Sequence, residues 1–124
     1  MRILVVDGDP EARAALFGIL RSSGGSVEGT ETLCDAVRSL MRQEVHLLVL
    51  DLHQPGFPCE TALAMLREVA PHVPVILTTH DPAGREAARW TQAGAFRVWG
   101  KPFSAGEVLE TVRRAQVASG RPLP

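Results

Sequence analysis

Short apolar segments alternate with amphipathic segments along the whole chain. Residues 2–7 (RILVVD), 45–51 (VHLLVLD) and 73–79 (VPVILTT) are rich in aliphatic side chains, show little polar alternation and end in polar residues. Such runs are typical of strands that are buried on both faces of a sheet. Residues 26–30 and 95–99 are shorter and less apolar, and we predict a weaker strand at each.

Each predicted strand is followed by a segment with helical periodicity. Asp9 can cap the first amides of the first helix, and Pro10 suits the first helical position. Ser104 can cap the last helix, and Glu107 lies at the spacing of a capping box. The first helix is expected to run from Pro10 to the glycines at 24 and 25, and the others over 32–42, 60–70, 82–93 and 104–118.

These elements make five strand–helix units, which predict one α/β domain. Parallel strands of this composition need helices on both faces, and right-handed crossovers place helices there. We therefore expect a doubly wound, five-stranded parallel sheet over residues 1–118, followed by a polar tail over residues 119–124. The proline and glycine content of residues 53–58 predicts a turn-rich loop.

Composition excludes several classes of protein. The chain has 124 residues and a formal net charge of -1, which suits one globular domain and argues against a strongly basic nucleic-acid-binding protein. No apolar run approaches the ~20 residues that span a bilayer, and the first residues do not resemble a secretory signal. Two cysteines, Cys34 and Cys59, lack metal-site spacing, and we expect both to be buried in a protein of the reducing cytoplasm.

Polar side chains follow the predicted strands at the edge where such folds bind ligands. Asp7 and Asp51 end two buried strands, Thr78 and Thr79 end a third, and Lys101 follows the last. Lys101 is the single lysine among 13 basic residues. Carboxylate oxygens suit Mg²⁺, whereas a hydroxyl and an ammonium group suit phosphoryl oxygens.

Four motifs in this order resemble the receiver domain of two-component response regulators. ILVVDGD resembles the first strand and its acidic cluster, and LLVLDLHQPG resembles the strand that carries the phosphoacceptor. PVILTT resembles the strand with the switch hydroxyl, and KPF resembles the lysine–proline motif. The match covers residues 2 to about 118. The resemblance implies a flavodoxin-like fold with strand order 2-1-3-4-5.

The resemblance also implies a role for each site residue. Asp51 would accept a phosphoryl group from a histidine kinase. Asp7, Asp51 and the backbone carbonyl of His53 would hold Mg²⁺. Thr79 and Lys101 would bind the phosphoryl group, and the peptide bond between Lys101 and Pro102 would be cis. The chain would then be a switch that is itself modified, and not an enzyme.

Several positions depart from the pattern of the family. Gly8 stands where the family has a second carboxylate, which is expected to weaken Mg²⁺ binding, and Asp9 is expected to cap the following helix rather than to replace the missing acid. His80 replaces a small residue, and we expect it to be a partly exposed loop histidine. Val98 stands where the family has an aromatic switch residue. The neighbouring Trp99 is not expected to replace that residue, because strand alternation puts its side chain on the opposite face.

Two kinds of function therefore stay open. A phosphorylated receiver would bind a kinase or phosphotransfer protein, and its fourth helix, fifth strand and fifth helix would form a homodimer or contact an effector. The alternative is a receiver-like interaction module that works without phosphorylation. Neither involves nucleic acid or a membrane. A flavodoxin-like ligand binder is disfavoured, because no glycine-rich phosphate loop follows the first strand.

Overall fold

Five parallel strands form one sheet in the order β2-β1-β3-β4-β5. A computed structural model of the chain describes residues 1–53 and 58–118. The predicted fold class and strand order are confirmed. The strands are β1 (Arg2–Val6), β2 (Ser26–Thr30), β3 (Leu47–Asp51), β4 (Val75–Thr79) and β5 (Arg97–Gly100).

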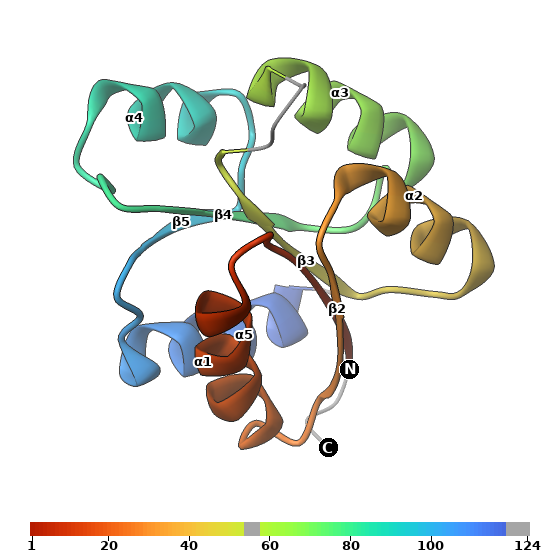
Figure 1. Cartoon of the computed structure of the whole chain (residues 1–124), viewed down its shortest axis with the longest axis vertical. Helices are drawn as coiled ribbons and strands as arrows, with labels where there is room; N and C mark the ends of the chain where they lie inside the picture. Colours follow the sequence, from red (N-terminus) through yellow and green to blue (C-terminus); the bar gives the residue numbers. More distant parts are fainter. Residues whose placement is uncertain (54–57, 119–124) are drawn as a thin grey trace.

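Helices cover both faces of the sheet, with α1 and α5 on one face and α2, α3 and α4 on the other (Figure 1). Each helix connects two successive strands, except α5, which follows the last strand. The helices are α1 (Pro10–Arg21), α2 (Leu33–Arg42), α3 (Cys59–Val69), α4 (Arg85–Gln92) and α5 (Ala105–Ala118).

Strand alternation divides the core into two layers. In β1, Ile3 and Val5 pack toward α1 and α5, whereas Leu4 and Val6 pack toward the other three helices. All four side chains are fully buried, as the absence of polar alternation predicts. Burying an aliphatic side chain of this size contributes about 1.5–3 kcal/mol to folding. The central strands therefore form a rigid base for the polar residues at their ends.

The predicted caps are confirmed, while several strand and helix ends differ. The side chain of Asp9 accepts a hydrogen bond from the Glu11 amide at 3.0 Å, and the Ser104 hydroxyl accepts one from the Glu107 amide at 3.3 Å. Strands β3 and β4 begin two residues later than predicted, because their apolar runs include the ends of the preceding connections. Helix α4 begins at Arg85 rather than at residue 82, after a turn closed by the Gly84 amide.

One cysteine corrects an expectation from the sequence. Cys34 is exposed and not buried, because it occupies a solvent-facing position in the first turn of α2. The side chain of Cys59, most of the predicted loop over 53–58 and the tail over 119–124 lie outside the residues that can be described. In the described part, no helix combines the length and the apolar character needed to cross a bilayer.

A buried tryptophan joins β5 to α5. The Trp99 indole is fully buried among the side chains beneath α1 and α5, and its N–H donates to the Thr111 hydroxyl at 3.1 Å. That hydroxyl in turn donates to the Glu107 carbonyl at 2.8 Å. Both polar groups are therefore satisfied inside the core, and the chain directly before Lys101 is held in place.

Replacing Thr111 with valine should leave the Trp99 N–H buried without an acceptor. We expect Thr111→Val to lower the free energy of unfolding by about 1–3 kcal/mol, although the side chains are nearly isosteric. Thr91→Val is the matched control, since Thr91 makes the same bond to its own helix, with the Ala87 carbonyl, but lies on the surface. We expect it to change stability by less than about 0.5 kcal/mol in denaturant titrations. Equal losses in the two variants would contradict this role for Thr111.

Candidate functional site

The carboxyl edge of the sheet brings together three of the charged residues predicted from the sequence. The Lys101 ammonium lies 2.9 Å from Asp7 Oδ2 and 3.6 Å from Asp51 Oδ1. The exposed fractions of the three side chains are 9% for Lys101, 2% for Asp7 and 14% for Asp51. We call these residues the charged triad. Its formal charge is -1, since one ammonium group faces two carboxylates.

Turns at the ends of β1 and β3 hold the two carboxylates. Asp7 Oδ1 accepts a hydrogen bond from the Asp9 amide at 2.9 Å, and Asp51 Oδ1 accepts one from the His53 amide at 3.2 Å. These bonds span two residues, as in the turns that aspartate favours. Each carboxylate is thus oriented by its own chain before any ligand binds.

Arg13 fixes the loop between β1 and α1, and the sequence motifs did not indicate this role. Its guanidinium donates to the backbone carbonyl of Asp7 at 2.6 Å and lies 3.7 Å from the Glu31 carboxylate. Arg13 therefore connects the end of β1 to the segment that follows β2. Nothing in the spacing of the chain could have shown this contact, because it depends on how α1 packs.

The environment of Asp51 makes its carboxylate unusually basic. Burial raises the pKa of the Asp51 carboxyl group above its usual value, and the nearby negative charge of Asp7 raises it further. The His53 amide and the Lys101 ammonium lower it, but they do not reverse the shift. A carboxylate whose conjugate acid has a raised pKa is a stronger base and a better nucleophile, which favours its attack on an electrophilic phosphorus.

Thr79 lies next to the charged triad, but its hydroxyl bonds elsewhere. It is buried at the end of β4, and its carbonyl accepts a hydrogen bond from the Lys101 amide at 2.8 Å. The Thr79 hydroxyl oxygen accepts from the Asp81 amide at 3.1 Å. The hydroxyl proton remains available to another acceptor. Contact between Thr79 and a phosphoryl group stays a prediction.

The oxygen atoms at the site are of the kind that Mg²⁺ prefers, but Gly8 leaves one acidic side chain fewer than the pattern of the family has. Asp7, Asp51 and the His53 carbonyl are hard oxygen donors, and Mg²⁺ commonly uses one or two carboxylates together with phosphate and water. Among the described residues, no group of three acidic, histidine or cysteine side chains could hold a metal. Asp9 is exposed and caps α1, as predicted, so it does not replace the missing acid.

Position 8 has room for the carboxylate that it lacks. A Cβ atom placed on Gly8 would meet one neighbour within 4 Å, the Glu31 carbonyl oxygen at 3.9 Å. The residue does not adopt a positive φ angle, so its backbone does not require glycine. Position 8 therefore lacks a negative charge, although the structure has space there for a carboxylate side chain.

The other departures in the sequence are located as predicted. Val98 packs toward α2, α3 and α4, whereas Trp99 packs toward α1 and α5, so Trp99 does not replace a switch aromatic at position 98. His80 is exposed in the loop after β4. At position 100 a glycine is needed for packing, because a Cβ atom there would lie 2.8 Å from Pro82 Cγ. The peptide bond between Lys101 and Pro102 is cis, as the resemblance implies.

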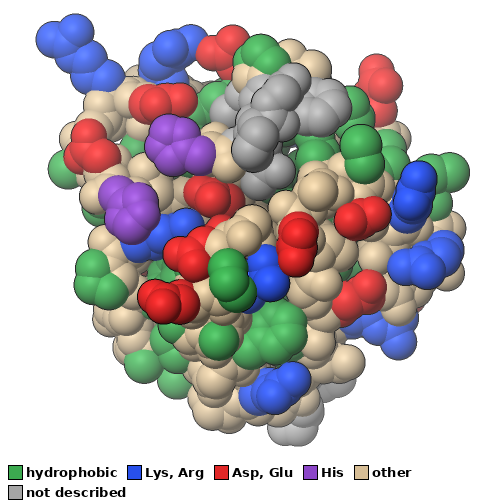
Figure 2. Space-filling model, in the orientation of Figure 1, with side chains coloured by type: hydrophobic (Ala, Val, Ile, Leu, Met, Phe, Trp, Pro, Cys, Tyr) green, Lys and Arg blue, Asp and Glu red, His purple; other side chains and the backbone are tan. Residues whose placement is uncertain are grey.

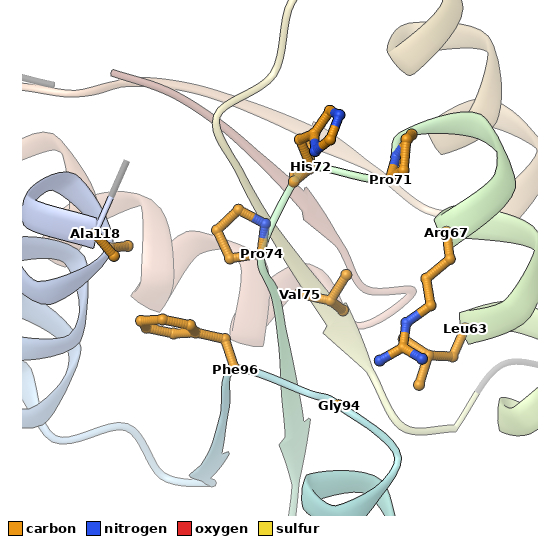
Figure 3. A pocket seen from close by; sticks show the side chains of 11 residues that line it. Leu63, Arg67, Pro71, His72, Pro74, Val75, Gly94, Phe96 and Ala118 are labelled. Atoms are coloured by element: carbon orange, nitrogen blue, oxygen red, sulfur yellow. The ribbon is translucent and has the colours of Figure 1, made fainter. Parts of the chain in front are cut away.

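The charged triad does not coincide with a hollow that the described residues form elsewhere on the molecule. A hollow of about 480 Å³ lies at the opposite, amino edge of the sheet, with Arg67, His72 and Phe96 around it (Figure 3). None of the predicted site residues lines it. The space-filling view instead shows acidic, basic and histidine side chains close together across the middle of one face (Figure 2).

Known proteins of one family are similar to this chain in sequence and in fold. The response regulator receiver domain matches residues 3–113. The response regulator protein FleR of Pseudomonas aeruginosa is 30% identical over 113 residues, which are 91% of this chain and 24% of that protein. The transcriptional regulatory protein GlrR of Escherichia coli is 30% identical over 110 residues, 89% of this chain and 25% of that protein.

Solved structures agree with the sequence relatives. The signal receiver domain of an HD domain-containing protein from Pseudomonas fluorescens has a TM-score of 0.85 at 26% identity, with 96% of each chain covered. The beryllofluoride-activated NtrC4 receiver domain dimer has a TM-score of 0.84 at 27% identity, covering 92% of this chain and 94% of that one. The chain spans about a quarter of the length of the curated relatives it matches, and it belongs to the response regulator receiver domain family.

Proposed function

We propose that this receiver domain is a phosphorylation switch in which Asp51 accepts a phosphoryl group from the phosphohistidine of a kinase or phosphotransfer protein. The observation that carries the proposal is the Lys101 ammonium, which lies within 3.6 Å of the buried Asp7 carboxylate and of the partly buried Asp51 carboxylate. Phosphoryl transfer depends mainly on positioning and on charge neutralisation, and the charged triad supplies both. The domain itself is modified, so it acts as a stoichiometric acceptor.

The transfer forms one bond and breaks one. An oxygen of Asp51 attacks the phosphorus, and the phosphorus–nitrogen bond of the donor breaks, leaving its electron pair on the imidazole nitrogen. The raised pKa of the Asp51 carboxyl group favours the attack. Lys101 can then bind the phosphoryl oxygens, and Thr79 still has a hydroxyl proton to donate.

Mg²⁺ would be held by Asp7, Asp51 and the backbone carbonyl of His53. When bound, it would neutralise negative charge on the phosphoryl oxygens. The loss of one carboxylate at Gly8 removes an attraction that is about 4 kcal/mol for two unit charges 4 Å apart at an effective dielectric constant near 20, and about twice that for a divalent ion. We therefore expect weak binding of the free ion and stronger binding together with a phosphoryl group.

The face formed by α4, β5 and α5 is the proposed output surface. Arg85, Arg97, Glu107 and Arg113 are exposed on it. The Lys101 amide bonds to the Thr79 carbonyl, so β5 and the start of the loop before α4 would move together. One structural relative is described as a receiver domain dimer. We propose that this face binds a second copy of the domain or an effector.

Incubation with Mg²⁺ and acetyl phosphate should add one phosphoryl group to the chain. We expect intact mass spectrometry to show the adduct in the wild type and to lose it in Asp51→Asn, because the amide is not a nucleophile. Asp9→Asn is the matched control, since it removes a carboxylate near the site while keeping a side chain that caps helices well. This control should keep the adduct.

Two outcomes would contradict the switch. An adduct that persists in Asp51→Asn would place the modification elsewhere. A wild type that gains no phosphoryl group from either acetyl phosphate or a phosphorylated histidine kinase would favour an interaction module that works without phosphorylation.

Restoring an acid at position 8 should strengthen Mg²⁺ binding. We expect Gly8→Asp to bind Mg²⁺ at least about tenfold more tightly in calorimetric titration, because it adds a negative charge beside Asp7 and Asp51. Gly8→Asn is the control of equal size without the charge, and it should gain much less. Equal affinities for wild type and Gly8→Asp would show that the missing acid does not limit the site.

A further inference from the structure

Thr78 carries a buried hydroxyl group that has no hydrogen-bond partner among the described residues. It lies in β4 one residue before the predicted switch hydroxyl, and it is 1% exposed. Its Oγ1 makes no hydrogen bond within the described part of the chain. Buried hydroxyl groups are nearly always paired, because an unpaired one loses its bond to water without a replacement. A hydroxyl in this position therefore needs an explanation.

The sheet register puts Thr78 beside the proposed phosphoacceptor. Thr78 pairs with Asp51 on one side and with Trp99 on the other. Two residues earlier, Val49 and Ile76 both pack toward α1 and α5. Because strand side chains alternate with a period of two, Asp51 and Thr78 share that face as direct neighbours. Thr79 points to the opposite face.

The other polar groups in this row are already paired. The Trp99 indole donates to the Thr111 hydroxyl, so it does not need Thr78. Asp51 Oδ1 lies near Lys101 and accepts a hydrogen bond from the His53 amide. Thr78 is thus left with an unused hydroxyl proton directly beside a carboxyl group whose surroundings must change if it is phosphorylated.

We infer that Thr78 is a positioning residue that donates its hydroxyl proton to the Asp51 carboxyl group in the phosphorylated state. This inference rests on the proposed function of Asp51. When Lys101 turns to the phosphoryl oxygens, the carboxyl group of the acyl phosphate loses part of its support. The Thr78 hydroxyl supplies a replacement from the row of the sheet that already contains Asp51.

This hydrogen bond speeds the loss of the phosphoryl group. In hydrolysis, water attacks the phosphorus and the bond from phosphorus to the Asp51 oxygen breaks. The electron pair returns to Asp51 as a carboxylate, phosphate departs, and the proton of the water passes to solvent. A donor on the carboxyl group stabilises the charge that builds up there, so Thr78 shortens the lifetime of the phosphorylated form.

Thr78→Val and Thr78→Ser test the role of the hydroxyl. After removal of the phosphodonor, we expect the aspartyl phosphate of Thr78→Val to last about 2- to 10-fold longer than that of the wild type, followed by intact mass spectrometry. Thr78→Ser keeps the hydroxyl and should stay within about twofold. The melting temperature of the unphosphorylated proteins is the second readout. Thr78→Val should melt at no lower temperature than the wild type, since valine removes an unpaired hydroxyl group and keeps the shape of the side chain.

Each result decides the inference. A wild type that is phosphorylated, with an equal lifetime in Thr78→Val, overturns the role of Thr78 and leaves the proposed function standing. A lower melting temperature for Thr78→Val shows that the hydroxyl is already paired in the resting state, which also overturns it. A wild type that accepts no phosphoryl group overturns both the proposed function and this inference.

Discussion

The site depends on one interaction, the contact of the Lys101 ammonium with the buried carboxylate of Asp7 and the partly buried carboxylate of Asp51. Two like charges at neighbouring strand ends repel each other, and burial strengthens that repulsion. The Lys101 ammonium, which directly follows β5 in the chain, offsets this repulsion because it lies 2.9 Å from Asp7 Oδ2 and 3.6 Å from Asp51 Oδ1. Removing Lys101 would leave two neighbouring carboxylates without a cation, and breaking a buried ion pair in this way costs about 3–5 kcal/mol. The ends of β1, β3 and β5 are therefore coupled.

Strand alternation places the polar residues of the site on two opposite faces of the sheet. Asp51, Thr78 and Trp99 form one row on the side of α1 and α5, where the proposed phosphorylation of Asp51 would take place. Thr79 and Val98 face α2, α3 and α4, where a change can reach the proposed output surface. The main-chain bond between Lys101 and Thr79 connects the two sides. This backbone bond joins β5 to the end of β4 without the aromatic ring that position 98 lacks.

Hydrophobic pattern predicted most of the fold, because burial on both faces of a parallel sheet leaves an unambiguous signature in the sequence. It predicted the starts of β3 and β4 less well, because Val45 and Val73 are apolar residues of the connections. The ends of the predicted strands correctly indicated that Asp7, Asp51 and Lys101 lie together, since a parallel sheet has the carboxyl ends of its strands at one edge. The contact of Arg13 with Asp7 and the unpaired hydroxyl of Thr78 depend on side-chain packing, which no spacing rule contains.

Charge counting explains how a receiver could work with Gly8 in place of an acid. At rest, two carboxylates and one ammonium give the triad a formal charge of -1. Phosphorylation removes the charge of Asp51 and adds a phosphoryl group of about -1.5 to -2. The same volume then holds more negative charge than before, with Lys101 still the only side-chain cation of the triad. The missing acid therefore weakens attraction for a divalent cation most in the resting state, and the phosphoryl group restores that attraction when neutralisation is needed.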